Sequence, residues 1–289
     1  FKQKTAYEIM PSLVGSEMCI RDRGTAGSIT LLLQALMISL LKVKQEVRFI
    51  IKGGTDVKYA PTINYLDKVL LPLLKKIGYV ADIEIIQHGF YPRGNGKVKF
   101  NFYGANLKKF SLVERGKLGG INCLSIATEH LKKQKVAERQ LNKVKELINQ
   151  RINVNLTQDL ALYVHSLSPG SSLLLWADFT NTLLGYDVLG EIKESSEEVA
   201  AECVESFLRQ FTSKACLDVF ASDQILPYLA LSKGRVTVTG ELNKEQNNQS
   251  DIKLSDHCLT NMHVIKKFLP VEFKVKKLNN CFEINVIHK

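Results

Sequence analysis

The sequence lacks the short motifs by which many nucleotide-binding and metal-binding proteins are recognised. It contains no P-loop, no GxGxxG dinucleotide motif and no HExxH motif. Its 6 cysteines are far apart and form no CxxC pair, so they indicate neither a zinc site nor a disulfide framework. His257 and His263 are six positions apart and would not share a helix face as metal ligands. We therefore expect no metal-ligating residue.

A long apolar run is also absent, which argues against a membrane span. The nearest approach is ITLLLQALMISLL at residues 29–41, after which Lys42 and Lys44 interrupt the pattern. A spanning helix needs about eighteen consecutive apolar residues, so we expect a buried helix here and no membrane partner. The scattered cysteines fit a reducing compartment. We expect a cytoplasmic protein, or a nuclear one if the source is a eukaryote, and no pattern predicts the oligomeric state.

The chain does contain enough apolar residues for a large core, since 45% of its 289 residues are hydrophobic. It carries 39 Lys and Arg against 29 Asp and Glu, and the resulting net charge of +10 attracts polyanions such as nucleic acid. The charge is spread along the chain, however, and pairs such as Lys75/Lys76 are typical of solvated helix faces. A general basic RNA-binding module therefore has little beyond net charge in its favour.

Residues 1–23 show no helix or strand period that continues into the rest of the chain, and PSLVGSEMCIRDR resembles translated adapter sequence. We set this segment apart as non-native. From Gly24 the periodicity becomes regular. It predicts a helix at 29–41, a strand at 47–54, a helix with Pro61 in its first turn that ends near Gly78, and strands at 82–87 and 97–102.

A change of pattern near residues 110–116 indicates a domain boundary. The following segment predicts strands at 121–128, 161–167 and 171–179, a charged helix at 132–150, and a helix that begins at the capping box Ser195-Ser196-Glu197-Glu198. The last segment predicts a helix at 223–234 and strands at 235–240, 272–277 and 281–286. Because helix and strand pairs recur on both sides of the middle, we predict an α+β fold of repeated β/α units with an inserted smaller α/β domain.

His257 poses the main chemical question, because it lies in the polar start of SDHCLTNMHVIKKFLP at residues 255–270. From the residues alone it could begin a capped helix, bind a metal, shuttle a proton or act as a nucleophile. The neighbouring Cys258 suggests a Cys/His pair, but adjacent side chains tend to point apart, which favours ordinary packing for the thiol. The isolated histidines at 88, 130, 165 and 288 are expected to be structural or exposed.

Five separated blocks resemble, in the same order, the RNA 3′-terminal phosphate cyclase family: GTAGSITLLLQ, GGTDVKYAPTINYL, HGFYPRGNG, DQILPYLAL, and HCLTN followed by FLPVEF. The likeness runs from Gly24 to the end of the chain. It implies repeated units that each have two helices and a four-stranded sheet. Together with the changes of pattern described above, it gives four expected parts: the segment 1–23, a second core repeat at 24–112, an inserted domain at 113–215, and a third repeat with the catalytic histidine at 216–289.

The resemblance also implies a chemistry for His257. In this family the histidine of the H-x-x-T-N stretch attacks the α-phosphorus of ATP and becomes adenylylated, and the AMP then passes to an RNA 3′-phosphate. The neighbouring ribose 2′-hydroxyl finally displaces AMP and leaves a 2′,3′-cyclic phosphate. The resemblance therefore implies ATP and RNA with 3′-phosphate ends as substrates. We expect Mg²⁺ or Mn²⁺ to bridge the triphosphate oxygens.

The same match assigns further site residues. It implies that Gln34 and the stretch from Phe220 to Gln224 contact ATP, namely Phe220, Ala221, Ser222, Asp223 and Gln224. Asp223 would orient the ring of His257 or stabilise the positive charge that develops on it, although a role as N-cap of a helix starting at Gln224 stays open. Arg93, in the glycine-rich HGFYPRGNG loop, is a candidate contact for an RNA phosphate, with an exposed arginine in a tight turn as the open alternative.

Two departures from the family pattern affect these expectations. Asn95 stands where the family usually has glycine, which is tolerable because asparagine adopts left-handed backbone conformations more readily than most residues. The family also begins with a further unit that carries a GEGGGQ-type element and arginines near the substrate phosphates. That unit is missing here, so we expect this chain to have weak or no cyclase activity. A non-catalytic cyclase-like protein of ribosome assembly is the open alternative, against which His257 within HCLTN favours an enzyme.

Overall fold

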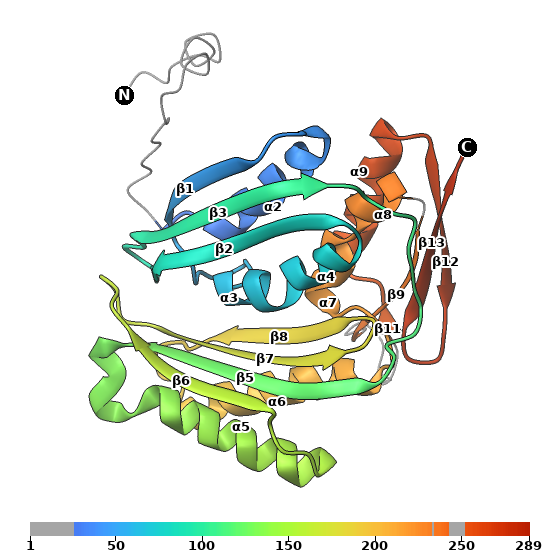
Figure 1. The fold of residues 1–289 in the computed structure, drawn as a ribbon. Helices are drawn as coiled ribbons and strands as arrows, with labels where there is room; N and C mark the ends of the chain where they lie inside the picture. Colours follow the sequence, from blue (N-terminus) through green and yellow to red (C-terminus); the bar gives the residue numbers. More distant parts are fainter. Residues whose placement is uncertain (1–25, 233, 243–251) are drawn as a thin grey trace, which may run out of the picture.

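The computed structural model describes residues 26–232, 234–242 and 252–289. Segment 1–23, which the sequence analysis sets apart, lies outside the described residues. The described part consists of mixed helices and sheets arranged in layers (Figure 1). The sheet formed by β1, β3 and β2 lies on one side, helices α3 and α4 lie beneath it, and a second sheet with α5 and α6 on its far face completes the stack.

The first β/α unit of the structure follows the predicted elements closely. It contains α2 (Ile29–Ser39), η2 (Leu40–Lys42), β1 (Val47–Gly53), α3 (Ile63–Tyr65), η3 (Leu66–Leu70), α4 (Leu71–Lys76), β2 (Tyr79–Gln87) and β3 (Gly96–Ala105). The hydroxyl of Ser28 caps α2 by accepting from the Leu31 N–H. Pro61 precedes the first helical turn instead of lying in it, because Thr62 is the N-cap residue of α3.

The last β/α unit contains β4 (Ser111–Leu112), α7 (Val219–Gln224), α8 (Leu226–Ser232), β9 (Arg235–Val238), α9 (Asp256–Phe268), β12 (Val271–Lys277) and β13 (Phe282–His288). A small pair of strands, β10 (Glu241–Leu242) and β11 (Ile252–Lys253), precedes α9. The expectation that Asp223 could be a helix N-cap is wrong. Helix α7 already contains Asp223, and Asp218 caps it by accepting from the Ala221 N–H at 2.7 Å.

The two units have the same topology, which confirms the predicted α+β fold with repeated units. Each unit begins with a short segment that pairs in parallel with the next strand. In the first unit Ser28 pairs with Gly54, directly after β1, and in the last unit β4 pairs with β9. The second strand then pairs antiparallel with the last strand, and the last with the third, giving the orders β1-β3-β2 and β12-β13-β9-β4. A shared connectivity of this kind is the mark of an internal repeat.

The remaining elements form a separate four-stranded sheet with its helices, and in the sequence they lie between β4 and α7 of the last unit. They are β5 (Leu118–Thr128), η4 (Glu129–Gln134), α5 (Val136–Ile152), β6 (Gln158–Val164), β7 (Ser171–Phe179), β8 (Leu183–Leu189) and α6 (Ser196–Thr212), with strand order β6-β5-β7-β8. The predicted capping box at Ser195 and Glu198 is present at the start of α6. These elements fall within 113–215, whose boundaries as a domain stay a prediction.

Both faces of the middle strands β5 and β7 are buried along most of their length, which explains why these strands are so apolar. One face packs against α5 and α6 through residues such as Leu173 and Val144. The other face joins the main core of the β/α units through Leu174 and Trp176. Within the described ranges, no helix is both long and apolar enough to cross a membrane.

Candidate active site

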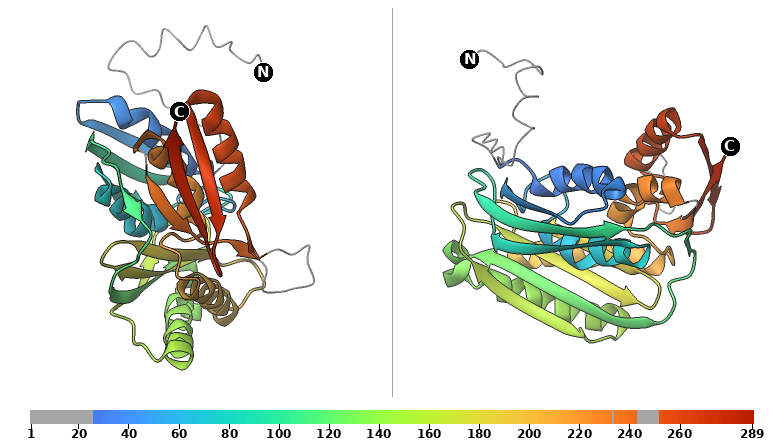
Figure 2. Two further views of the ribbon diagram at one scale, coloured as in Figure 1. Left: turned by 90° about the vertical axis from the view of Figure 1, so that its right-hand side faces the viewer. Right: turned by 45° about the horizontal axis from the view of Figure 1, so that its top comes forward.

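A large cleft lies where the three groups of elements meet, with a cavity volume of about 1490 Å³. Its walls come from α2, the 57–62 loop, the edge strand β8, α6, α7 and the first turns of α9. Residues more than two hundred positions apart in the sequence therefore face one space. Figure 2 shows how the central sheet and both β/α units approach one another around this junction.

His257 is the second residue of α9 and lines the cleft. The hydroxyl of Ser255 caps this helix by accepting from the Cys258 N–H at 3.1 Å, so the helix-start reading of the motif is confirmed. Cys258 points away into the core, where burial raises the pKa of its thiol to about 12. A thiol that stays protonated at neutral pH is a poor nucleophile, whereas the imidazole of His257 is exposed and lines the cleft.

Asp223 is the carboxylate that interacts with His257. Burial raises the pKa of Asp223 to about 6, and the nearby His257 ring opposes that rise by favouring the charged form. Asn261, one helical turn after His257, donates from its side chain to the backbone carbonyl of Asp223 at 3.1 Å. Helices α7 and α9 are thus joined at the point where the acid and the imidazole face the cleft.

Gln34 and Gln224 also meet in the cleft, although 190 positions separate them. The side-chain amide of Gln34 on α2 donates to the amide oxygen of Gln224 on α7 at 3.1 Å. Each side chain keeps further hydrogen-bonding groups that a ligand can use. The pair brings a residue from each β/α unit to one wall of the cleft.

Phe220 provides an aromatic wall at the same place. Its ring stacks against Tyr186 of β8 with a centroid distance of 5.1 Å, and it meets the ring of Tyr65 in an edge-to-face contact with a centroid distance of 5.4 Å. Phe220 and Tyr186 both line the cleft, whereas Tyr65 is fully buried behind them. The side chains of Ala221 and Ser222 are buried and do not line the cleft. Of the stretch 220–224, Phe220, Asp223 and Gln224 therefore present side chains to a ligand.

Arg93 lies outside the cleft lining, in the 88–96 loop, where its side chain is exposed. Its backbone N–H donates to the hydroxyl of Ser168 at 3.1 Å. This hydrogen bond joins the 88–96 loop to the loop between β6 and β7 of the central sheet. Asn95 has a φ of 58°, which confirms the expected left-handed conformation. The structure does not bring Arg93 together with His257.

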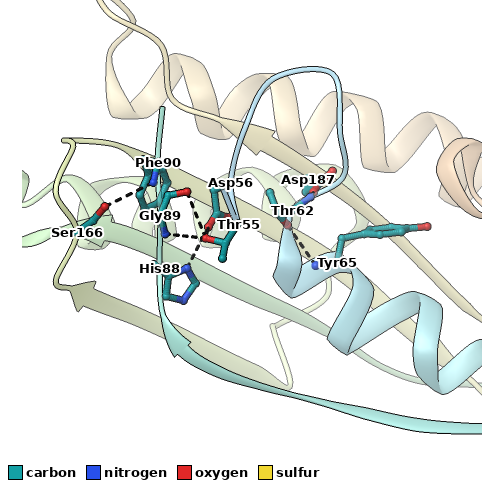
Figure 3. A network of polar contacts seen from close by, with 9 residues as sticks. All are labelled: Thr55, Asp56, Thr62, Tyr65, His88, Gly89, Phe90, Ser166 and Asp187. Atoms are coloured by element: carbon teal, nitrogen blue, oxygen red, sulfur yellow. Dashed lines mark hydrogen bonds and ion pairs between the residues drawn. The ribbon is translucent and has the colours of Figure 1, made fainter. Parts of the chain in front are cut away.

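A buried polar network, not anticipated from the sequence, lies behind the 57–62 loop (Figure 3). His88 contacts a carboxylate oxygen of Asp56 at 3.0 Å, and Thr55 donates to the same oxygen at 2.6 Å. At the other end of the loop, the Thr62 N–H donates to Asp187 of β8 at 2.6 Å. These contacts hold both ends of the loop that forms one rim of the cleft. His88 is thus structural, as expected.

The cleft has mixed charge. Its acidic side chains are Asp187, Glu191, Glu194, Glu202, Asp223 and Glu241, and its basic ones are Lys58, Arg209 and Lys253. Lys58 forms an ion pair with Glu191 at 2.5 Å. Arg209, on α6, donates to the Ser206 hydroxyl at 2.9 Å. Among the residues that the structure describes, no group of three or more His, Cys, Asp or Glu side chains could hold a metal ion.

Four residues near the cleft escaped the sequence reasoning: Tyr65, Tyr186, Asp187 and Asp218. Asp218 is completely buried, and burial raises the pKa of its carboxyl to about 6. One signal could have found Asp187, because a charged residue within the apolar strand LLGYDVL needs a partner once the strand is buried. Asp218 and Tyr65 carry no comparable local pattern.

Comparisons with known proteins show which family this chain resembles. The family model described as RNA 3′-terminal phosphate cyclase matches residues 4–275, a range that begins within segment 1–23. The RNA 3′-terminal phosphate cyclase of Pyrococcus furiosus is 34% identical over 284 residues, covering 96% of this chain and 76% of the relative. The Ignicoccus hospitalis protein of the same name is 35% identical over 272 residues, covering 92% and 73%. This chain therefore belongs to the RNA 3′-terminal phosphate cyclase family.

Proposed function

We propose that this protein is an ATP-dependent RNA 3′-terminal phosphate cyclase that works through a covalent His257–AMP. The observation that carries the proposal is the meeting of His257, Asp223 and Phe220 in one cleft, within a chain of this family. The cleft is open and large enough for both a nucleotide and the end of an RNA strand. The net charge of +10 favours association with the RNA backbone.

In the first step, a neutral ring nitrogen of His257 attacks the α-phosphorus of ATP. The new P–N bond forms as the bond to the β-phosphate oxygen breaks, and pyrophosphate leaves. Positive charge develops on the imidazole, and the Asp223 carboxylate stabilises it until the ring releases its proton. The rings of Phe220 and Tyr186 offer an aromatic surface for the base. The amides of Gln34 and Gln224 offer hydrogen bonds to the nucleotide.

In the second step, an oxygen of the RNA 3′-phosphate attacks the same phosphorus, and the P–N bond to His257 breaks. The product is an RNA end joined to AMP through a diphosphate. In the third step, the ribose 2′-hydroxyl attacks the RNA phosphorus and loses its proton, and AMP leaves. The RNA then ends in a 2′,3′-cyclic phosphate, and His257 is free for another cycle.

We propose that Mg²⁺ or Mn²⁺ is bound mainly through the oxygens of the triphosphate, which are good ligands for these hard cations. A metal bound to ATP would neutralise charge on the departing pyrophosphate. Arg93 stays a proposed contact for RNA phosphate at a distance from the cleft.

Labelling with ATP tests the proposal. We expect that the full chain, incubated with ATP labelled at the α-phosphate and a divalent metal, acquires acid-labile label that His257→Asn abolishes. His263→Asn is the matched control, because His263 lies exposed on the same helix. Label that persists in His257→Asn would refute the assignment of the nucleophile. Absence of label in the unmodified chain, with RNA binding intact, would favour a non-catalytic cyclase-like protein of ribosome assembly.

A further inference from the structure

Asp218 is a junction of three parts of the fold, and the mechanism above does not use it. One carboxylate oxygen accepts from the Tyr65 hydroxyl of α3 and from the Ala221 N–H of α7, each at 2.7 Å. The other oxygen accepts from the Gly185 N–H of β8 at 2.8 Å. Donors from the first unit, the central sheet and the last unit therefore converge on one fully buried carboxylate.

The same contacts surround the aromatic wall of the cleft. Gly185 directly precedes Tyr186, whose ring stacks on Phe220. The ring of Tyr65 makes an edge-to-face contact with Phe220, while its hydroxyl donates to Asp218. A methyl group at Gly185 would approach the Val69 side chain to 2.7 Å, so β8 lies tightly against the helix that carries Tyr65. The position of Phe220 is thus defined from two sides.

Helix α7 has separate anchors at its two ends. Asp218 and the Gln210 side chain hold its first turn, the latter by accepting from the Val219 N–H at 2.6 Å. Asn261 holds its last turn through the carbonyl of Asp223. Phe220 lies at the first end and Asp223 at the second. A change at the first anchor should therefore disturb the aromatic wall more than the acid beside His257.

We propose that Asp218 and Tyr65 are positioning residues that hold Phe220 in place against the nucleotide base without touching the nucleotide. The inference rests on the proposed function, because it assumes that the base packs on Phe220. It assigns the two residues to nucleotide affinity and not to the transfer of AMP. Loss of the Tyr65 hydroxyl removes one donor from the junction and leaves the ring contact with Phe220 in place.

Equilibrium binding of α,β-methylene-ATP by the full chain tests this role, because the analogue cannot transfer AMP. In isothermal titration, we expect Tyr65→Phe to raise the Kd by up to roughly fivefold to tenfold, because a Phe220 ring loosened by the loss of one hydrogen bond to a carboxylate must be ordered again when the base binds. The rate of His257 labelling at saturating ATP should stay within about twofold of the unmodified chain. A purely structural role would instead lower the binding stoichiometry, as protein is lost from the folded state, at unchanged Kd.

Tyr103→Phe is the matched control, since the Tyr103 hydroxyl also donates to an aspartate, Asp82, but on the exposed sheet away from the cleft. It should leave the Kd unchanged. Asp218→Asn should raise the Kd in the same direction as Tyr65→Phe, and it provides a second test if one variant folds poorly. A double-mutant cycle with Phe220→Leu should show that the effect of Tyr65→Phe largely disappears once the ring is gone.

The outcomes separate the two levels of the proposal. Failure of the unmodified chain to bind the analogue would refute the nucleotide function itself, together with the positioning role that rests on it. Normal binding by the unmodified chain, with an unchanged Kd in Tyr65→Phe, would refute only the positioning role. Additive effects of Tyr65→Phe and Phe220→Leu would also refute it, because the two residues would then act independently.

Discussion

The buried carboxylate of Asp223 places a negative charge beside His257 and lowers the free energy of unfolding. Burial raises the pKa of Asp223 to about 6 from the ordinary value of 3.8. Between these values the folded state binds more protons than the unfolded state, so the stability contributed by this group falls as pH rises through the interval. Above pH 6 the carboxylate is ionised in both states, and the full cost is present.

Replacement by a neutral side chain of the same shape should therefore stabilise the protein and impair its chemistry. We expect Asp223→Asn to raise the free energy of unfolding at pH 7.5 by up to about 3 kcal/mol, with the gain shrinking as pH falls to 4. Urea unfolding at the two pH values measures the difference. His257 labelling should decrease in the same variant. An unchanged unfolding midpoint at pH 7.5 would show that burial imposes no such cost.

At the scale of elements, Arg115 joins the beginning and the end of the central group of strands and helices. Its guanidinium donates to the carbonyls of Gln210 and Phe211 in the last turn of α6 at 2.8 and 2.6 Å, and to that of Ala215 at 2.5 Å. The charge also lies over the ring of Phe179 at 5.3 Å. Helix α6 carries Gln210, which anchors α7, so this contact supports the cleft indirectly.

Lysine cannot reproduce this arrangement, because a single ammonium group does not have the planar set of donors of a guanidinium. We expect Arg115→Lys to lower the free energy of unfolding by roughly 2–4 kcal/mol, since at least one carbonyl is left without its donor. Arg139→Lys is the control. It alters an exposed ion pair with Glu197, for which about 1 kcal/mol or less is expected. Urea denaturation of both variants decides whether the α6 contact has the larger effect.

For the whole molecule, the cleft couples three groups of elements that each contain a separate part of the site. Gln34 comes from the first unit, Tyr186 from the central sheet, and His257 from the last unit. A ligand that contacts all three binds only when they are assembled. Its binding free energy is therefore added to the stability of the assembled protein.

We expect ATP at about 100 times its Kd to increase the free energy of unfolding by about 2.7 kcal/mol. Thermal unfolding should show a single transition that moves to higher temperature with increasing ATP. His257→Asn should show the same increase, which separates binding from covalent labelling. Two transitions, of which ATP moves only one, would show that the groups unfold independently and that the site does not link them.

Local chemistry allowed much of the fold to be predicted. The capping box at Ser195 and Glu198, the apolar period of residues 29–41 and the left-handed Asn95 each depend on neighbours a few positions away. Helix ends were less predictable. Asp223 and Asp218 are both residue types that favour a helix N-cap. Asp218 caps α7, and Asp223 lies within the helix. Only the packing of α7 decides which of the two aspartates is the cap.

The sequence by itself determined the elements, the repeated α+β plan and the motif that contains His257, because period, caps and motifs are short-range patterns. Only the tertiary structure decided which side chains share the cleft. Gln34 and Gln224 are 190 positions apart, and Tyr65 and Asp218 are 153 apart. Hydrogen bonds over such separations leave no local pattern in a sequence. They exist because burial forces each polar group to find a partner wherever the folded chain supplies one.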